Sequence, residues 1–195
     1  MKLKNYEFKS DPYQHQLDTL KSSAHRNLFA LFLEMGLGKS KILLDNAGML
    51  FEEGKISGLL IVSPKGNLNN WDSNEISRHL PERIKRNVLV WQPNHTQRWT
   101  KAFKDMVQND STGVLNIFLV NVEAFATVKA CTHVEEFLVT HDAMMAIDES
   151  TTIKNPKAKR TKHLIKLGPL ADYRRILTGF PITKAPLDLY SQCYF

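Results

Sequence analysis

Short apolar runs recur along the chain at a spacing that predicts alternating strands and helices. Strands are expected at 28–33, 59–62, 88–91, 117–120, 143–147 and 175–177, and helices between them at about 39–53, 68–79, 98–107, 133–140 and 156–167. Apolar runs without polar alternation are typical of strands buried on both faces of a parallel sheet. The pattern predicts an α/β fold, with one domain over residues 1–195 and helices on both faces of a mostly parallel sheet.

Local signals predict where some helices begin and end. Gly54 can end the first long helical segment, because glycine readily adopts the left-handed conformation found after helices. Asn155 can cap the segment at 156–167, with Pro156 in its first turn and Gly168 at its end.

Composition favours a globular protein in a reducing compartment. Of the 195 residues, 43% are hydrophobic and 24% are charged, which is ordinary for a soluble domain. No apolar run approaches the ~18 residues that cross a membrane, and the N-terminus does not resemble a signal peptide. Two distant cysteines fit a reduced, cytoplasmic setting, and no histidine or cysteine spacing suggests a zinc site.

Charge is unevenly placed along the chain. The net charge is +6, from 26 basic and 20 acidic residues. No acidic residue lies between Glu149 and Asp172, a segment that contains Lys154, Lys157, Lys159, Arg160, Lys162 and Lys166. This basic block suggests a polyanionic partner. A solvated helix face that carries lysines for solubility explains it equally well.

The clearest candidate for chemistry follows the first apolar run. Residues 34–40 read Glu-Met-Gly-Leu-Gly-Lys-Ser, so a strand leads into a glycine-rich turn and then a helix. Glycines let successive backbone N–H groups face an anion, and the helix N-terminus adds positive potential. Lys39 would reach the β- and γ-phosphates, and the Ser40 hydroxyl would bind Mg²⁺. Leu33 stands where the full phosphate-loop pattern has glycine, so a simple flexible turn is the alternative.

A pair of carboxylates follows the apolar run at 143–147. Asp148 and Glu149 would lie at the carboxyl edge of the sheet, where open α/β sheets bind ligands. Neighbouring strand residues point to opposite sides, so the two should have different tasks. Asp148 would hold the magnesium ion, and Glu149 would orient or deprotonate the attacking water. The alternative is that the pair only ends a strand.

With these motifs in place, the chain resembles the first RecA-like lobe of a Swi/Snf-type ATPase, within helicase superfamily two. Five segments carry the resemblance in order: Pro-Tyr-Gln at 12–14, Met-Gly-Leu-Gly-Lys-Ser at 35–40, Val-Ser-Pro-Lys through Trp at 62–71, Asp-Glu-Ser with Ile-Lys-Asn at 148–155, and Leu-Thr-Gly-Phe-Pro-Ile through Tyr at 177–190. Two departures stand out. The motif is usually Asp-Glu-Ala/Gly-His, and here Ser150 stands at its third position and Thr151 at the position of the histidine. The histidine normally makes a polar contact with the 177–182 motif, and either hydroxyl could make that contact instead. Phe180 replaces a threonine.

The resemblance implies a three-layer α/β/α fold, ATP and Mg²⁺ as cofactors, and movement along duplex DNA bound through its phosphate backbone. Gln14 would read the adenine, and the remaining nucleotide contacts would be Met35, Gly36, Leu37, Gly38, Lys39 and Ser40. The implied DNA contacts are Pro64, Lys65, Asn121, Lys154, Thr178 and Gly179. The catalytic residues would be Lys39, Asp148 and Glu149, and the metal ligands Ser40 and Asp148. Trp71, Trp91 and Trp99 are interpreted as packing residues rather than base-stacking platforms.

The motifs of a second RecA-like lobe do not occur in residues 1–195. A second lobe, in cis or in trans, would be needed to complete the ATP site with an arginine. The competing interpretation is a one-lobed module that binds nucleic acid or protein without ATP turnover. A phosphate-loop kinase is disfavoured, because no arginine-rich lid segment follows the motifs.

Overall fold

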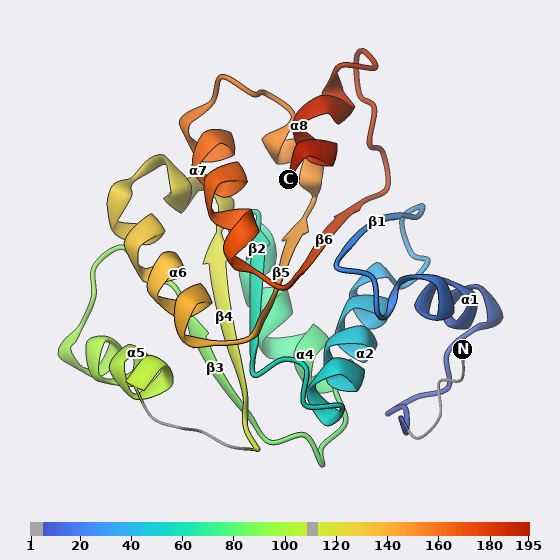
Figure 1. Ribbon diagram of the computed structural model, residues 1–195, viewed down its shortest axis with the longest axis horizontal. Helices are drawn as coiled ribbons and strands as arrows, with labels where there is room; N and C mark the ends of the chain where they lie inside the picture. Colours follow the sequence, from blue (N-terminus) through green and yellow to red (C-terminus); the bar gives the residue numbers. More distant parts are fainter. Residues whose placement is uncertain (1–5, 109–112) are drawn as a thin grey trace.

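The computed structural model describes residues 6–108 and 113–195. Its strands form one sheet in which all neighbours are parallel, in the order β1-β6-β5-β2-β4-β3 (Figure 1). The strands are β1 Leu28–Phe32, β2 Gly58–Ser63, β3 Arg86–Val90, β4 Leu115–Asn121, β5 Ala143–Asp148 and β6 Tyr173–Thr178. Every strand expected from the apolar runs is confirmed.

Each of the five expected helical segments contains a helix, one of the five is split in two, and two further helices occur. They are α1 Gln14–Ser23, α2 Lys39–Glu52, α3 Lys65–Asn70, α4 Ile76–His79, α5 Gln97–Gln108, α6 Val128–Thr140, α7 Lys159–Leu167 and α8 Asp188–Tyr194. The helix expected at 68–79 is broken, because a π-helical turn, Trp71–Glu75, separates α3 from α4. Short 3₁₀ turns lie at Val122–Ala126, Ser150–Ile153 and Gly168–Leu170. The additions are α1 and α8.

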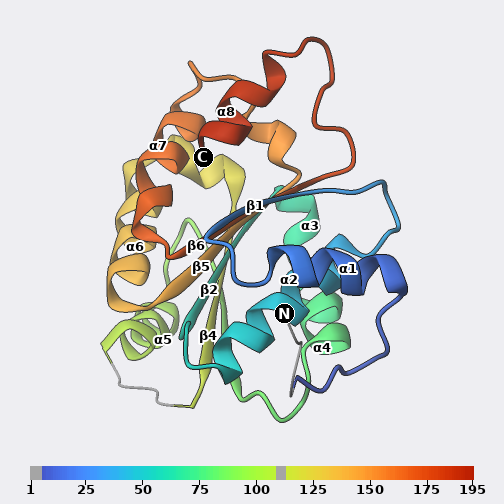
Figure 2. The same ribbon diagram turned by 45° about the vertical axis from the view of Figure 1, so that its right-hand side comes forward.

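The helices form a layer on each face of the sheet. Figure 2 shows the sheet nearly edge-on, with α1, α2, α3 and α4 on one side and α5, α6 and α7 on the other. Successive residues of β2 therefore enter different cores: Leu59 and Ile61 pack toward α2, whereas Leu60 and Val62 pack toward α6. This confirms the three-layer α/β/α architecture.

The helix-end predictions gave mixed results. Gly54 follows the end of α2 with φ +67°, as expected of a glycine that ends a helix. The prediction that Asn155 caps α7 was wrong. Its side-chain oxygen instead accepts a hydrogen bond from the Lys157 backbone N–H at 3.0 Å, which closes a turn before the helix. The helix begins at Lys159, and Gly168 follows its last residue as expected.

The segment before α1 packs across the outer side of α2. The Tyr6 ring lies on Gly48, where any Cβ would collide with the tyrosine hydroxyl. Beside it, Lys41 and Asp45 form a buried ion pair with 2.9 Å between Nζ and Oδ2. Burial raises the pKa of Asp45 to about 6 even though the Lys41 ammonium opposes the shift. The N-terminal segment thus covers charged groups on α2.

Candidate nucleotide site and nucleic-acid surface

The glycine-rich loop joins β1 to the start of α2. Gly36 and Gly38 have φ of +82° and +78°, a region that side-chain-bearing residues rarely adopt. A Cβ placed on Gly36 would meet no atom within 4 Å, so the backbone there is open to a ligand. Gly38 is the N-cap of α2, and the unpaired N–H groups of the first turn follow it. This is the geometry of an anion-binding turn.

Lys39 lies over the same loop. Its ammonium donates hydrogen bonds to the backbone oxygens of Leu33 at 2.9 Å and Glu34 at 3.1 Å. The side chain is half-buried, so a phosphate bound on the loop would exchange these two neutral acceptors for a charged one. The donor set fits a polyphosphate.

Asp148 ends β5 and is held by three hydrogen bonds. Its Oδ2 accepts from the Ser63 hydroxyl at 3.0 Å and from the Trp71 indole N–H at 3.0 Å. Its Oδ1 accepts from the Glu149 backbone N–H at 3.0 Å. Sequence reasoning assigned no polar role to Ser63 and placed Trp71 in the core. Trp71 is indeed buried at 2% exposure, but its one polar atom faces Asp148.

Glu149 has a strained backbone. Its φ of 49° and ψ of 60° are left-handed, and no other non-glycine residue in 6–108 or 113–195 has a positive φ. Such strain is concentrated at functional sites and persists only where the surroundings enforce it. The Thr178 hydroxyl lies 3.5 Å from the Glu149 carboxylate, at the long limit of a hydrogen bond.

The sheet brings these segments to one edge. β6 lies between β1 and β5, with Thr178 opposite Phe32 and Leu177 opposite Asp148. A Cβ placed on Gly179 would lie 3.5 Å from the backbone nitrogen of Met35, so the turn after β6 touches the glycine-rich loop. The structure therefore places residues 35–40, 148–149 and 178–179 at the same carboxyl edge of the sheet.

A cavity of about 630 Å³ opens beside the loop. The lining residues are Ser10, Asp11, Tyr13, Gln16, Gly36, Gly38, Lys39, Ser40, Lys41, Glu75, Arg78 and His79. Lys39, Lys41 and Arg78 are basic, whereas Asp11 and Glu75 are acidic, and Lys41 is already paired with Asp45, so the excess of positive charge is small. Sequence reasoning missed Gln16, which is buried and donates from Nε2 to the Leu37 backbone oxygen at 3.3 Å. Its place two residues after the Pro-Tyr-Gln element was the only available signal.

Gln14 lies outside the lining of that cavity. Its side chain is exposed, and its amide donates to the Asp18 carboxylate at 2.9 Å. The adenine contact expected of Gln14 remains a prediction that requires the side chain to leave Asp18.

Ser150 connects the segment after β5 to the segment after β6, the contact for which the family uses the histidine that this chain lacks. Its hydroxyl donates to the Gln192 side-chain oxygen at 2.7 Å, and the Gln192 amide donates to the Pro181 backbone oxygen at 2.8 Å. Both side chains are buried. The segment after β5 is therefore tied to the segment after β6 through α8, and Ser150 is the hydroxyl that makes the connection.

Some of the expected DNA-binding residues share a second hollow at the carboxyl edge. Lys65 and Asn121 line a groove of about 570 Å³ with Trp91 and Lys129, between the ends of β2, β3 and β4. Pro64 precedes it as the N-cap of α3. Lys129, which sequence reasoning missed, also donates to the Pro93 backbone oxygen at 2.9 Å.

Other expected DNA-binding residues are engaged within the protein. Thr178 is 1% exposed, and its hydroxyl oxygen accepts from the Phe180 backbone N–H at 3.2 Å. The expectation that its side chain faces DNA is corrected by this burial. Lys154 lies 3.9 Å from the Asp188 carboxylate and donates to the Thr183 hydroxyl, so its charge is partly neutralised. Gly179 faces the glycine-rich loop.

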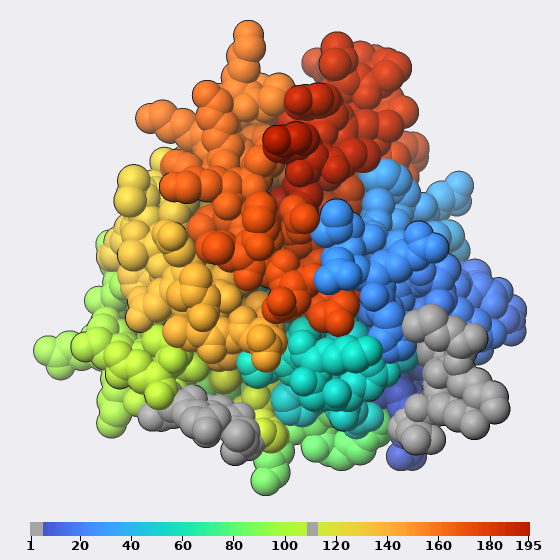
Figure 3. Space-filling model, in the orientation of Figure 1, coloured from blue at the N-terminus to red at the C-terminus, as the bar shows by residue number. Residues whose placement is uncertain are grey.

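The rest of the basic block lies on the α7 side of the molecule. Lys157, Lys159, Lys162 and Lys166 are all exposed. Figure 3 shows α6 and α7 next to each other on the near face, in amber and orange. None of these four lysines lines the groove that contains Lys65.

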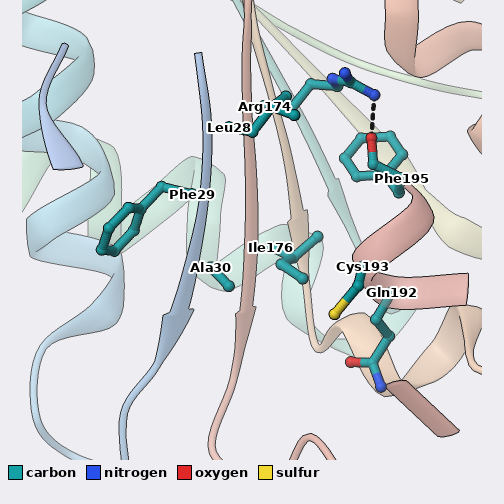
Figure 4. A pocket seen from close by; sticks show the side chains of 8 residues that line it. All are labelled: Leu28, Phe29, Ala30, Arg174, Ile176, Gln192, Cys193 and Phe195. Atoms are coloured by element: carbon teal, nitrogen blue, oxygen red, sulfur yellow. Dashed lines mark hydrogen bonds between the residues drawn. The ribbon is translucent and has the colours of Figure 1, made fainter. Parts of the chain in front are cut away.

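A smaller hollow of about 200 Å³ lies between β1, β6 and α8 (Figure 4). Ala30 and Ile176 face it from neighbouring positions of the two strands, whereas Phe29 points to the opposite side of the sheet. Arg174 donates to the backbone oxygen of Phe195 across its rim. The Gln192 side chain has partners within the protein for both of its polar atoms, whereas the buried Nε of Arg174 has none. None of the site residues predicted from the sequence lines this hollow.

Metal binding at the site would rely on few protein ligands. Within the described ranges, no three or more His, Cys, Asp or Glu side chains gather in a way that could hold a metal ion. Mg²⁺ commonly binds through one or two protein groups together with phosphates and water. The Ser40 hydroxyl and the Asp148 carboxylate are oxygen ligands of that kind.

Of the helices in the same ranges, none combines the length and apolar character that crossing a membrane requires.

A glycine-rich loop leading into α2, with two carboxylates at the end of β5, defines a RecA-like α/β domain. The profile of the SNF2-related domain matches residues 15–195. The chain belongs to this family.

Relatives and solved structures agree. The chain is 30% identical over 163 residues to the chromatin-remodeling ATPase INO80 of Debaryomyces hansenii, covering 83% of this chain and 11% of the relative. It is 28% identical over 187 residues to the ISWI chromatin-remodeling complex ATPase ISW1 of Saccharomyces cerevisiae, covering 94% and 15%.

The fold is similar to the Sulfolobus solfataricus SWI2/SNF2 ATPase core in complex with dsDNA, with a TM-score of 0.74 and 24% identity over 97% of this chain and 36% of that one. The UvsW helicase of bacteriophage T4 gives a TM-score of 0.64 at 16% identity, over 97% of this chain and 61% of that one. The chain spans only 11% and 15% of the lengths of the two curated relatives named above.

Proposed function

We propose that this chain is the ATP-binding lobe of a DNA-dependent ATPase that moves along duplex DNA. The observation that carries the proposal is the meeting of three segments at one sheet edge. These segments contribute an open glycine-rich loop, the hydrogen-bonded carboxylate of Asp148, and Glu149 with its strained backbone. All three lie at the carboxyl edge of the sheet. Family membership supports the same reaction class.

The residues divide the work of phosphoryl transfer. The N–H groups of residues 36–40 and the Lys39 ammonium would bind the phosphates, and Ser40 and Asp148 would hold Mg²⁺, which would supply positive charge at the phosphate oxygens. Glu149 orients the attacking water and accepts its proton on the side-chain carboxylate, with Thr178 beside it to limit its rotation. These groups act by position and charge, which is what this reaction requires.

DNA would bind along the groove that contains Lys65 and Lys129. Both lysines are exposed. Asn121 lines the same groove, where its amide donates to the Glu123 carboxylate at 3.1 Å and would have to exchange that partner for a phosphate oxygen. Lysine and amide groups suit phosphate oxygens, so binding would be independent of sequence and weakened by salt. The fold neighbour from Sulfolobus solfataricus is a SWI2/SNF2 ATPase core in complex with dsDNA, which makes duplex DNA the first ligand to test.

A second lobe would close over the nucleotide. Large apolar side chains stand exposed around the site, with Met35 at 78%, Phe180 at 70% and Ile182 at 47% exposure. Exposed apolar groups beside a charged cleft are typical of an interaction surface. The closing lobe would supply an arginine, which is worth ~10³–10⁵ in rate in related phosphoryl-transfer enzymes. Residues 1–195 alone are therefore expected to bind nucleotide weakly and to turn it over negligibly.

Nucleotide binding and hydrolysis test this proposal. The chain should bind a fluorescent ATP analogue in the presence of Mg²⁺, and Lys39→Ala should abolish binding. In a complete two-lobed protein, Glu149→Gln should trap ATP uncleaved, and duplex DNA should stimulate the parent enzyme at low salt. DNA binding that is unaffected by ATP, without nucleotide binding, would instead favour a one-lobed binding module.

A further inference from the structure

The Trp71 indole is buried, and its one polar atom donates to an acidic residue of the site. Trp71 opens the π-helical turn between α3 and α4 and is 2% exposed. Its ring lies in the core on the α2 side of the sheet, and Nε1 donates to Asp148 Oδ2 at 3.0 Å. π-Helical turns occur often at functional sites, because they shift one side chain out of the regular helical register.

Ser63 donates to the same oxygen of Asp148. β2 and β5 run in parallel with Val62 opposite Ile147, so the next residues, Ser63 and Asp148, are also neighbours. The Ser63 side chain is 0% exposed, and its hydroxyl lies 3.0 Å from Asp148 Oδ2. Trp71 and Ser63 thus approach one carboxylate oxygen from two different elements.

The Asp148 carboxylate lies on the face of the sheet that α2 covers. Residues that alternate along a strand share one face, and Met144 and Ala146 pack in the core on the α2 side. Asp148 continues that series, so it faces the side on which α2 begins with Lys39 and Ser40.

One oxygen of Asp148 keeps a free hydrogen-bond acceptor position. A carboxylate offers about four lone-pair positions, two on each oxygen. Trp71 and Ser63 occupy those on Oδ2, and the Glu149 N–H occupies one on Oδ1. One position remains, on Oδ1.

We propose that Trp71 and Ser63 are positioning residues that saturate Oδ2 and present Oδ1 of Asp148 to the magnesium ion or to its bound water. The inference rests on the proposed function, because it concerns the metal of the same nucleotide site. Groups that orient a metal-binding carboxylate typically change metal affinity by ~10–100-fold when removed. Trp71→Phe, which keeps the ring and loses the N–H, should therefore raise the Mg²⁺ concentration needed for nucleotide binding by about 10-fold. Binding of nucleotide without metal should be unchanged.

The indole N–H resonance of Trp71 gives a direct readout. The signal is assigned by its loss in Trp71→Phe. A nonhydrolysable ATP analogue added with Mg²⁺ should shift this resonance, whereas the analogue with EDTA should shift it far less. Trp99 is the matched control, because its Nε1 donates to the Val90 backbone oxygen at 2.8 Å and its ring packs in the other core. Its resonance should not respond, and Trp99→Phe should leave the Mg²⁺ requirement unchanged.

Ser63→Ala provides a second variant if Trp71→Phe fails to fold, since it removes the other donor with little change in core volume. It should raise the Mg²⁺ requirement in the same direction. Wild-type Mg²⁺ dependence in both variants, with normal nucleotide binding, would overturn the positioning role and leave the proposed function standing. Failure of the wild-type chain to bind nucleotide, with or without Mg²⁺, would overturn both.

Discussion

The Ser150 hydroxyl donates to the Gln192 side-chain oxygen at 2.7 Å and so joins the end of β5 to α8. Gln192 passes the connection on through its amide, which donates to the backbone oxygens of Pro181 and Asp188. The segment after β5 and the segment after β6 are thereby linked through hydrogen bonds, of which the one between Ser150 and Gln192 is buried. Displacement of either segment would break these bonds, so we expect the link to couple their positions.

Ser150→Ala should destabilise the chain by about 1–3 kcal/mol, because it leaves the Gln192 oxygen without a donor in a buried position. Urea unfolding measures the loss. Ser73→Ala is the control, since that hydroxyl is exposed and should cost under about 0.5 kcal/mol. A double-mutant cycle with Gln192→Leu should give a coupling of about 1 kcal/mol. A coupling near zero would show that the two side chains act independently.

Because Glu149 has a left-handed backbone, a glycine substitution there should be less destabilising than an alanine substitution, the reverse of the order in a helix. Glycine tolerates φ of 49°, whereas alanine pays about 1–2 kcal/mol there. Glu149→Gly should therefore be more stable than Glu149→Ala by about 1 kcal/mol, net of the extra entropy of unfolded glycine. The same two substitutions at exposed Glu135 in α6 serve as the control, where alanine should be the more stable by about 0.5–1 kcal/mol. Thermal unfolding of the four variants measures these differences in stability. If the alanine variant were the more stable at both positions, the prediction would be contradicted.

Asp45 should make stability fall as pH rises. Its pKa is raised to about 6 by burial, from an ordinary value of 3.8 in the unfolded chain. Between these values the folded state holds a proton that the unfolded state has released, so the unfolding free energy decreases from about pH 4 to pH 6 and then levels off. Two units of pKa correspond to a loss of up to about 3 kcal/mol.

Urea unfolding of the wild-type chain and of Asp45→Asn at several pH values measures this effect. The asparagine variant should lack the decrease, so the stability difference between the two proteins should change across that window. Parallel curves would mean that the Lys41 ammonium keeps Asp45 ionised throughout.

The groove lysines should govern the salt dependence of DNA binding. Lys65→Ala and Lys129→Ala should each weaken binding to any duplex sequence and lower the slope of log affinity against log salt by about one. Lys85→Ala is the control, because that exposed lysine precedes β3 at the opposite edge of the sheet. Lys159→Ala tests the α7 surface separately. If only Lys159→Ala changed the slope, the DNA would bind along α7 and not in the groove.

The sequence predicted the strands well, because each central strand is buried on both faces and shows as an unbroken apolar run. It also placed the chemical residues at the carboxyl edge, since parallel strands share their polarity. Short α1 and α8 were missed, because neither carries a long apolar periodicity. The break at Trp71–Glu75 was missed because a π-helical turn has no clear signal in one sequence.

Residue roles that depend on distant segments could not be predicted. Trp71 was correctly expected to be buried, but the approach of its indole to Asp148 requires the packing of α3 against the sheet. The burial of Thr178 and the pairing of Lys154 with Asp188 likewise follow from how the chain after β6 folds back. Gln16, rather than Gln14, faces the loop because of the rotation of α1.

A crystal structure of the chain with Mg²⁺ and a nonhydrolysable ATP analogue tests the central claim most directly. The phosphates should lie on the N–H groups of residues 36–40, with the Lys39 ammonium turned from the Leu33 and Glu34 oxygens toward them. The metal should lie between Ser40 and Asp148. A nucleotide bound elsewhere, or Lys39 more than ~10 Å from Asp148 and so beyond reach of any shared ligand, would contradict the account.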